Sequence, residues 1–310
     1  MNQGLINCLV WLEWPESCFR ANDKDIKFLC ELLPPGSEVQ RVKTEASFLR
    51  KLPKATHAMV WSFKKEWFAL APNLKVLATP GAGRELVAFR DAPAGVTVHF
   101  GGFHGPVIAE SVAGFMLAWA HGFFRVQSER MNGRGIWPRE RFGDRMFVIA
   151  GTKAVIVGYG KIGRAIGEKL TALGVEVQGF SRANIKDLPK AAKDAKWFIM
   201  ALPSDTGTDN FLDHKLLSKL PIGAVVINIG RGNAIDESAL AKAIANGTIA
   251  GAYLDVFKNE PTVLNPNADC GMHPLWDERN TKIIAMPHST AFTNDYIKRS
   301  FKELHDEGII

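Results

Sequence analysis

Short apolar runs alternate with amphipathic helical stretches along the whole chain. In the first hundred residues the pattern predicts a helix at 23–33, which stops at Pro34-Pro35-Gly36, and strands at 6–12, 37–42, 58–61 and 74–78. A second series follows a connector at 132–145, with strands at 153–157, 175–180, 197–201, 224–229, 251–257 and 282–286 and helices at 162–173 and 237–246. This alternation indicates mostly parallel sheets covered on both faces.

The most apolar stretch of the chain, residues 107–124, predicts one long helix from Ile108 to about Arg130. Glu110, Ser111 and His121 interrupt this stretch, and a membrane span needs about 20 largely apolar residues, so we expect no membrane segment here. The amino terminus has no basic region before its first apolar run, so no signal peptide is expected either.

Composition and charge narrow the class of protein. A chain of 310 residues favours two domains, and 46% hydrophobic with 23% charged residues is typical of soluble globular proteins rather than disordered or collagen-like chains. The net charge of +6 comes from scattered Lys and Arg, so no nucleic-acid partner is expected. Because Cys8, Cys18, Cys30 and Cys270 form no C-x-x-C pair, we expect neither a metal site nor a disulfide framework, and a cytoplasmic location.

A glycine motif gives the strongest local signal, because it joins an apolar strand directly to an amphipathic helix. Gly158 permits the tight turn, Gly160 lets the backbone approach a pyrophosphate, and Gly163 lets the helix pack close to the strand. Lys161 and Ile162 open the helix, whose N-terminal N–H groups would face the phosphates. The motif therefore predicts a dinucleotide site.

The end of the following strand predicts which dinucleotide binds. An acidic residue about 20 positions after the motif would hold the ribose 2′-hydroxyl of NAD, but Ser181 and Arg182 stand there instead. A hydroxyl and a guanidinium suit a 2′-phosphate, so we expect NADP(H) in preference to NAD(H). The alternative is that the pair merely opens a solvated loop.

Three further polar stretches each follow a predicted parallel strand. Asn228 to Gly232 contains Arg231, Glu260 follows the strand at 251–257, and His288 follows the strand at 282–286. Ligands of open α/β sheets bind at the carboxyl ends of the strands, so these residues and the glycine motif should share one edge.

These stretches resemble the D-isomer-specific 2-hydroxyacid dehydrogenase family, in order, over most of the chain. The matching segments are 81–83, 108–112, 158–163, 201–203, 223–261, 274–276 and 287–288. Within that family, Ser181-Arg182, Val60-Trp61 and the chain length look most like glyoxylate/hydroxypyruvate reductases.

The resemblance implies two doubly wound α/β domains. A Rossmann-type NAD(P)-binding domain at 104–288 would be inserted in a flavodoxin-like substrate domain made of 1–103 and 289–310. It also implies a homodimer, in which the helix from Ile108 and the arm after it form the contact.

The implied activity is NAD(P)H-dependent reduction of a small 2-oxo acid to the D-2-hydroxy acid. Arg231 would grip the carboxylate and carbonyl oxygens of the substrate, since a guanidinium is always charged and offers a planar fork. His288 would supply the proton, because its ordinary pKa of about 6.5 lies near neutral pH. Glu260 would pair with the imidazole and favour its protonated form.

Further roles also follow from the resemblance. Asp255 would meet the nicotinamide carboxamide, although it could instead be a buried structural acid. The Ile229 backbone and the Leu202-Pro203 turn would line the cofactor.

On the substrate side, the N–H groups of Ala82 and Gly83 would hold the carboxylate. Arg84 would add a second carboxylate contact or face outward, and Trp61 would wall the pocket or serve as a core aromatic.

Two other functions fit the same residues. One is a dinucleotide-sensing protein similar to the family's transcriptional corepressors, which would bind the cofactor with little turnover. The other is a different dehydrogenase of the family, acting on phosphoglycerate, formate or phosphite.

Overall fold

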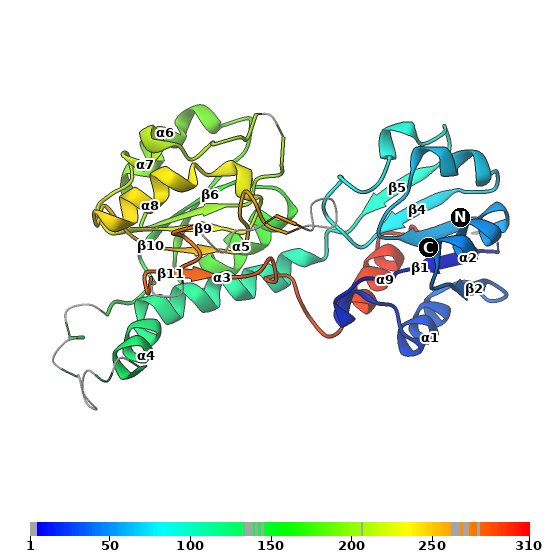
Figure 1. Cartoon of the computed structure of the whole chain (residues 1–310), viewed down its shortest axis with the longest axis horizontal. Helices are drawn as coiled ribbons and strands as arrows, with labels where there is room; N and C mark the ends of the chain where they lie inside the picture. Colours follow the sequence, from blue (N-terminus) through cyan, green and yellow to red (C-terminus); the bar gives the residue numbers. More distant parts are fainter. Residues whose placement is uncertain are drawn as a thin grey trace. The chain divides into compact units, whose positions relative to one another are not determined.

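In the computed structural model the chain divides into two units, one made of residues 1–104 and 292–310 and the other of residues 105–291 (Figure 1). The structure describes residues 5–131, 133, 139, 142–143, 146–205, 207–261, 267–268, 273–277 and 280–310. The connector predicted at 132–145 and Cys270 therefore lie largely outside the described residues.

The first unit is built on a parallel five-stranded sheet of order β2-β1-β3-β4-β5. Its strands are β1 (Asn7–Trp11), β2 (Glu38–Arg41), β3 (His57–Val60), β4 (Val76–Thr79) and β5 (Thr97–Phe100), and its helices are α1 (Asp23–Leu32), α2 (Glu45–Lys51) and α9 (Tyr296–Asp306). The central strands β3 and β4 are buried along their whole length, whereas the edge strands β2 and β5 are partly exposed. This strand order is that of the flavodoxin-like doubly wound fold, as predicted.

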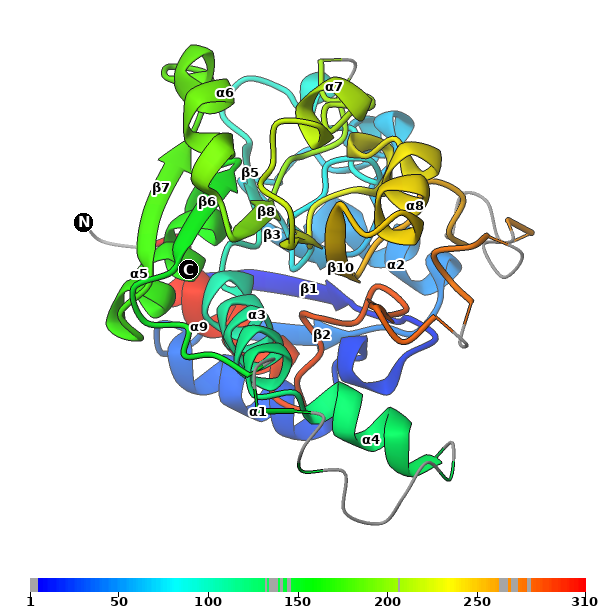
Figure 2. The same cartoon turned by 90° about the vertical axis from the view of Figure 1, so that its left-hand side faces the viewer.

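The second unit is built on a parallel six-stranded sheet of order β11-β10-β9-β8-β6-β7. Its strands are β6 (Lys153–Val157), β7 (Glu176–Phe180), β8 (Trp197–Met200), β9 (Ala224–Asn228), β10 (Ile249–Leu254) and β11 (Ile283–Ala285). Its helices are α3 (His104–Ala120), α4 (Phe123–Met131), α5 (Lys161–Ala172), α6 (Leu188–Ala191), α7 (His214–Leu217) and α8 (Glu237–Ala245). Figure 2 labels β7, β6, β8 and β10 in this order across the sheet, and β9 lies between the last two.

Both faces of this second sheet carry a hydrophobic core, because alternate residues of each buried strand point to opposite sides. In β6, Ala154 and Ile156 belong to the core on the face covered by α3 and α5, whereas Val155 and Val157 belong to the core on the opposite face, covered by α8. The sheet is thus covered on both faces, as expected for a Rossmann-type fold.

The prediction of one unbroken helix from Ile108 to Arg130 is wrong. The structure breaks it into α3 and α4, with a bend of 62° between them. Gly122 lies at the break with φ +70°, a left-handed conformation that commonly ends a helix at glycine. Among the described residues no single helix is long and apolar enough to cross a membrane. The bent pair of α3 and α4 reaches the required length and apolar composition only when the two helices are taken together.

Candidate active site

The glycine motif occupies the turn from β6 into α5, and each glycine has a separate structural reason. Gly158 has φ +91°, and a Cβ there would lie 2.5 Å from the carbonyl oxygen of Ala201. A Cβ at Gly163 would lie 2.4 Å from the carbonyl oxygen of Gly158. At Gly160, the N-cap of α5, a Cβ would meet no described atom within 4 Å. The motif therefore leaves open space before the helix N-terminus, which fits a pyrophosphate.

Tyr159 fastens this loop to β7. A Cβ at Gly179 would lie 2.3 Å from Cγ of Tyr159, and a Cβ at Gly167 would lie 2.5 Å from its hydroxyl oxygen. The N–H groups of Gly158 and Tyr159 both donate to the carbonyl of Phe180, at 2.9 and 3.0 Å. Two glycines outside the motif thus make room for the ring that holds the loop.

The Ser181-Arg182 turn directly follows β7. The amide of Asn184 shapes it, because its Oδ1 accepts from the Ser181 N–H at 2.8 Å and its Nδ2 donates to the Gly179 carbonyl at 2.9 Å. The Arg182 side chain is 94% exposed, and its Nη2 donates to Oδ2 of Asp205 at 3.0 Å.

The Leu202-Pro203 turn and Ile229 lie next to the glycine motif. A Cβ at Gly158 would lie 3.1 Å from the Leu202 nitrogen, and a Cβ at Gly230 would lie 2.5 Å from the Leu202 carbonyl oxygen. Ile229 is buried and its N–H donates to Met200 at the end of β8. The structure therefore brings these predicted cofactor residues together at the carboxyl ends of β6, β8 and β9.

Asn228, the buried last residue of β9, shapes the turn that carries Arg231. Its Oδ1 accepts from the Gly230 N–H at 3.1 Å, and its Nδ2 donates to the Arg231 carbonyl at 3.0 Å. Arg231 Nη1 donates to the Gly230 carbonyl at 2.9 Å. A Cβ at Gly232 would lie 2.0 Å from the backbone carbon of Phe257, so this turn packs tightly on the segment that leads to Glu260.

His288 and Glu260 form an ion pair, with 2.8 Å between Nδ1 and Oε1. The other carboxylate oxygen of Glu260 accepts from the Phe257 N–H at 3.0 Å, which fixes the acid. The Glu260 side chain is only 18% exposed, whereas that of His288 is 50% exposed. The imidazole is therefore oriented through Nδ1 and keeps a solvent-accessible portion.

This pairing shifts both pKa values. Burial lowers the pKa of His288, but the hydrogen bond and negative charge of Glu260, with the charge of Asp255, outweigh it and hold that pKa above its ordinary value. Burial raises the pKa of Glu260, but the hydrogen bond and positive charge of His288 outweigh it, so this pKa is lowered. The positive charge of Arg231 lowers both pKa values.

Asp255 is buried and supports the His288 loop. Its Oδ1 accepts from the N–H groups of Ser289 and Thr290, at 2.8 and 3.0 Å, while its carbonyl accepts from the His288 N–H at 2.9 Å. His288 itself has φ +53°, a left-handed backbone conformation that few residues other than glycine adopt. Such strain persists only where surrounding contacts impose it.

The predicted substrate residues lie in the first unit, at the carboxyl ends of β3 and β4. Ala82 and Gly83 lie in the loop after β4, and the Arg84 guanidinium lies 5.2 Å from the ring centroids of both Phe89 and Phe100. Arg84 is therefore exposed but anchored by aromatic rings.

Trp61, half-buried at the end of β3, belongs to an aromatic cluster with Trp14, Phe19 and Tyr296. Its indole N–H donates to the Phe19 carbonyl at 3.0 Å. A Cβ at Gly81 would lie 3.9 Å from this indole, so the tryptophan and the glycine loop are neighbours.

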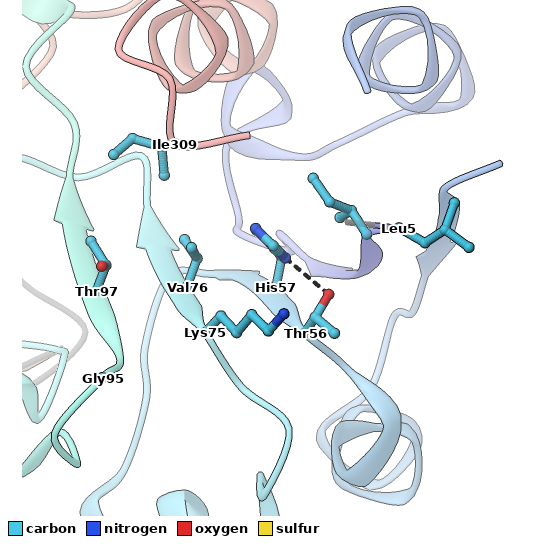
Figure 3. A pocket seen from close by; sticks show the side chains of 9 residues that line it. Leu5, Thr56, His57, Lys75, Val76, Gly95, Thr97 and Ile309 are labelled. Atoms are coloured by element: carbon cyan, nitrogen blue, oxygen red, sulfur yellow. Dashed lines mark hydrogen bonds between the residues drawn. The ribbon is translucent and has the colours of Figure 1, made fainter. Parts of the chain in front are cut away.

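A cavity of about 340 Å³ in the first unit is not part of this arrangement (Figure 3). It lies at the amino ends of β3, β4 and β5, lined by His57, Lys75, Val76 and Thr97 among others. The predicted substrate residues follow the opposite, carboxyl ends of these strands. Within the part of the chain that the structure describes, no group of three or more His, Cys, Asp or Glu side chains could hold a metal ion.

Sequence reasoning missed several supporting residues. Asn228 begins the polar stretch 228–232, but the sequence assigned it no role, and nothing in the sequence singled out Tyr159, Asn184 or Asp205. Their contacts connect loops that are separate in sequence, so only the folded chain reveals them.

Residues 113–290 match the model of the NAD-binding domain of the D-isomer specific 2-hydroxyacid dehydrogenases, more than half of the chain. The chain therefore belongs to this family of oxidoreductases. A glycerate dehydrogenase of Methylorubrum extorquens is 28% identical over 237 residues, covering 73% of this chain and 72% of that protein. A hydroxypyruvate reductase of Thermotoga maritima is 26% identical over 250 residues, covering 75% and 78%.

Solved structures show the same fold over nearly the whole chain. A D-isomer specific 2-hydroxyacid dehydrogenase from Xanthobacter autotrophicus Py2, in complex with NADPH and MES, has a TM-score of 0.74 at 23% identity. A dehydrogenase of the same description from Lactobacillus delbrueckii ssp. bulgaricus, in its NAD-complexed form, has a TM-score of 0.78 at 16% identity. Each match covers 98% of this chain and 96% of the other.

Proposed function

We propose that this protein reduces a small 2-oxo acid, of the glyoxylate or hydroxypyruvate type, to the D-2-hydroxy acid with NADPH. The observation that carries this proposal is the 2.8 Å pair of His288 and Glu260, at the sheet edge that also holds the Arg231 turn and the glycine motif. The names of two relatives, glycerate dehydrogenase and hydroxypyruvate reductase, support the small substrate.

Arg231 binds the substrate in this proposal. Its guanidinium holds the carboxylate and the carbonyl oxygen together, which orients the carbonyl carbon and draws electron density toward the oxygen. The nicotinamide, when bound, supplies the hydride. Asn228 acts as a positioning residue, because it bonds to the backbone on both sides of the Arg231 turn.

His288 donates the proton that the reduced carbonyl oxygen requires. Because Nδ1 is bonded to Glu260, we assign the proton transfer to Nε2. Glu260 raises the pKa of the imidazole, so the protonated acid is present near neutral pH. Asp255 holds the loop that presents the ring.

The cofactor assignment rests on the glycine motif and the turn after β7. The open space at Gly160 accommodates a pyrophosphate, and the exposed Arg182 guanidinium beside Ser181 can reach a 2′-phosphate. Lys161, Ile162, Leu202, Pro203 and Ile229 would line the rest of the cofactor site.

The substrate assignment in the first unit is also a proposal. The N–H groups of Ala82 and Gly83 would bind the carboxylate, Arg84 would add a cationic contact, and Trp61 would limit the size of the substrate side chain. The first unit would be the substrate domain and the second the NADP(H)-binding domain.

We also propose a homodimer formed through the second unit. Several large apolar side chains there are exposed in the single chain, namely Phe123, Met131, Met146 and Val148. Large apolar side chains left exposed to solvent favour association, because a second copy of the chain can cover them. Sedimentation should give twice the 34.1 kDa mass of the chain.

The proposed activity is tested by initial rates of reduced-nicotinamide absorbance loss. NADPH and NADH are tried separately with glyoxylate, hydroxypyruvate, pyruvate and a bulky aryl 2-oxo acid. Fast NADPH-dependent reduction of the small acids is expected. Tight NADPH binding without turnover of any acid would contradict the proposal and favour a dinucleotide sensor.

A further inference from the structure

The ion pair between Arg182 and Asp205 joins two loops across the glycine motif. Arg182 follows β7 and Asp205 lies in the loop after β8, and the sheet order places β6 between these two strands. β6 ends at Val157, directly before Gly158. The pair therefore spans the sheet edge where the dinucleotide is expected to bind.

The two partners differ in how firmly they are held. The other oxygen of Asp205, Oδ1, accepts from the Gly207 N–H at 2.8 Å, and the buried Thr208 hydroxyl binds the backbone of Asp205 at 2.8 and 3.0 Å. The Asp205 carboxylate is thus fixed by its own loop. Arg182, with its side chain 94% exposed, is a long flexible side chain held at its tip.

From this geometry we infer that Asp205 is a second determinant of cofactor specificity, which restrains the preference for NADPH. This inference rests on the proposed function, because it assumes that Arg182 binds the 2′-phosphate. To do so, Nη2 of Arg182 must exchange the carboxylate oxygen of Asp205 for a phosphate oxygen. The fixed negative charge of Asp205 would then face a doubly charged phosphate and repel it.

NADH has no 2′-phosphate, so it neither competes with Asp205 for Arg182 nor is repelled by the Asp205 carboxylate at that position. Asp205 therefore lowers the affinity for NADPH and leaves that for NADH nearly unchanged. By pairing with Arg182 in the free protein, Asp205 thus reduces the difference between the affinities for NADPH and NADH.

The experiment measures direct binding of NADPH and of NADH to the full chain, by nicotinamide fluorescence at low and at high salt. Asp205→Asn keeps the size of the side chain and its acceptor for Gly207 but removes the charge. NADPH affinity should rise about two- to fivefold, the range expected for an exposed ion pair, and the gain should shrink at high salt. NADH affinity should change less than twofold.

Two further variants make the result specific. Asp194→Asn removes the same charge from an exposed ion pair with Lys153 in the same unit and should leave both affinities unchanged. In the background of Arg182→Gln, Asp205→Asn should raise NADPH affinity by a smaller factor. The competition for Arg182 is already absent there, and only the repulsion of the phosphate remains to be relieved.

The outcomes separate this inference from the proposed function. Wild-type protein that binds NADPH, with no tightening in Asp205→Asn, would overturn the inference alone. A fall in NADH affinity in Asp205→Asn would also overturn it, since Asp205 would then be an acceptor for the ribose hydroxyl. Wild-type protein that binds neither dinucleotide would overturn both.

Discussion

The carboxylate of Asp255 accepts a hydrogen bond at 2.8 Å from the backbone N–H of Ser289, the residue that follows His288. A second N–H, that of Thr290, donates to the same oxygen at 3.0 Å. Because His288 has a left-handed backbone, its ring direction depends on how firmly the following residues are held. The buried acid thus supports the imidazole through the backbone. Its expected contact with the nicotinamide carboxamide stays a prediction.

Removal of this acceptor should loosen the His288 loop. Asp255→Ala would leave two backbone N–H groups without their acceptor, at a cost of about 1–3 kcal/mol in the free energy of unfolding, with a fall in kcat. Asp255→Asn retains an acceptor oxygen, so the losses in unfolding free energy and in kcat should both be smaller. Chemical unfolding and initial rates check this; equal stability of Asp255→Ala and wild-type protein would contradict the supporting role.

The pH dependence of reduction should report the His288–Glu260 pair. The proton donor acts in its protonated form, so kcat/KM should fall as the pH rises through the raised pKa of His288. Glu260→Gln removes the negative charge that raises the pKa of His288, so kcat/KM should begin to fall at lower pH. Above the midpoint, activity should drop about tenfold for each pH unit by which the midpoint moves. Rate profiles from pH 5 to pH 10 measure this.

Removal of the imidazole itself is the complementary test. His288→Asn should reduce kcat by about 10²–10⁴-fold, the usual contribution of a positioned general acid. NADPH affinity should stay within a few-fold of wild type, because the predicted contacts of the cofactor are made by other residues. Near-normal turnover with intact cofactor binding would remove His288 from the mechanism.

The glycine motif offers a matched pair of substitutions. Gly163→Ala would place a Cβ 2.4 Å from the Gly158 carbonyl oxygen, so the fold itself should lose stability. Gly160→Ala would place its Cβ in open space, so the melting temperature should stay close to wild type while NADPH affinity falls at least tenfold. Calorimetry and fluorescence titration separate the two effects. Unchanged NADPH affinity in Gly160→Ala would place the pyrophosphate elsewhere.

His57 should make the protein less stable in acid. The pKa of His57 is lowered to about 4, chiefly by burial; a hydrogen bond with the Ile309 backbone opposes the shift, and the positive charge of Lys75 adds to it. Since the unfolded chain takes up this proton near pH 6.5, stability is lost as the pH falls from about 6.5 to 4.

Between pH 7.5 and pH 5 this histidine should contribute about 2 kcal/mol to the loss of unfolding free energy. Urea unfolding at the two pH values should show a smaller loss in His57→Gln than in wild type. His214→Gln, at an exposed position, serves as the control and should behave as wild type does. An identical loss in His57→Gln and wild type would refute the assignment.

Most of the strands could be predicted from the sequence, because buried parallel strands read as short apolar runs. The predicted strand at 153–157 coincides with β6, and the helix predicted at 23–33 ends one residue earlier as α1. β5 (Thr97–Phe100) and α2 (Glu45–Lys51) were not predicted, since an edge strand with exposed positions and a seven-residue helix carry little periodic signal. The break at Gly122 was missed because one glycine does not reveal its φ angle.

The pairing of His288 with Glu260 was expected from the family resemblance, and the structure places the two side chains in contact. The Arg182–Asp205 pair was not expected. The two residues are 23 positions apart and meet only because β7 and β8 flank β6. Such contacts depend on strand order, which the local pattern of residues does not contain.

The ring of Tyr159 has a consequence for redesign. Because it fills the space above Gly179 and beside Gly167, the phosphate loop is already held to β7 before any dinucleotide arrives. Binding then has little loop entropy to overcome, which favours tighter binding of the cofactor. It also means that exchanges at Ser181 and Arg182 aimed at a new cofactor can succeed only if position 179, two residues earlier, remains glycine.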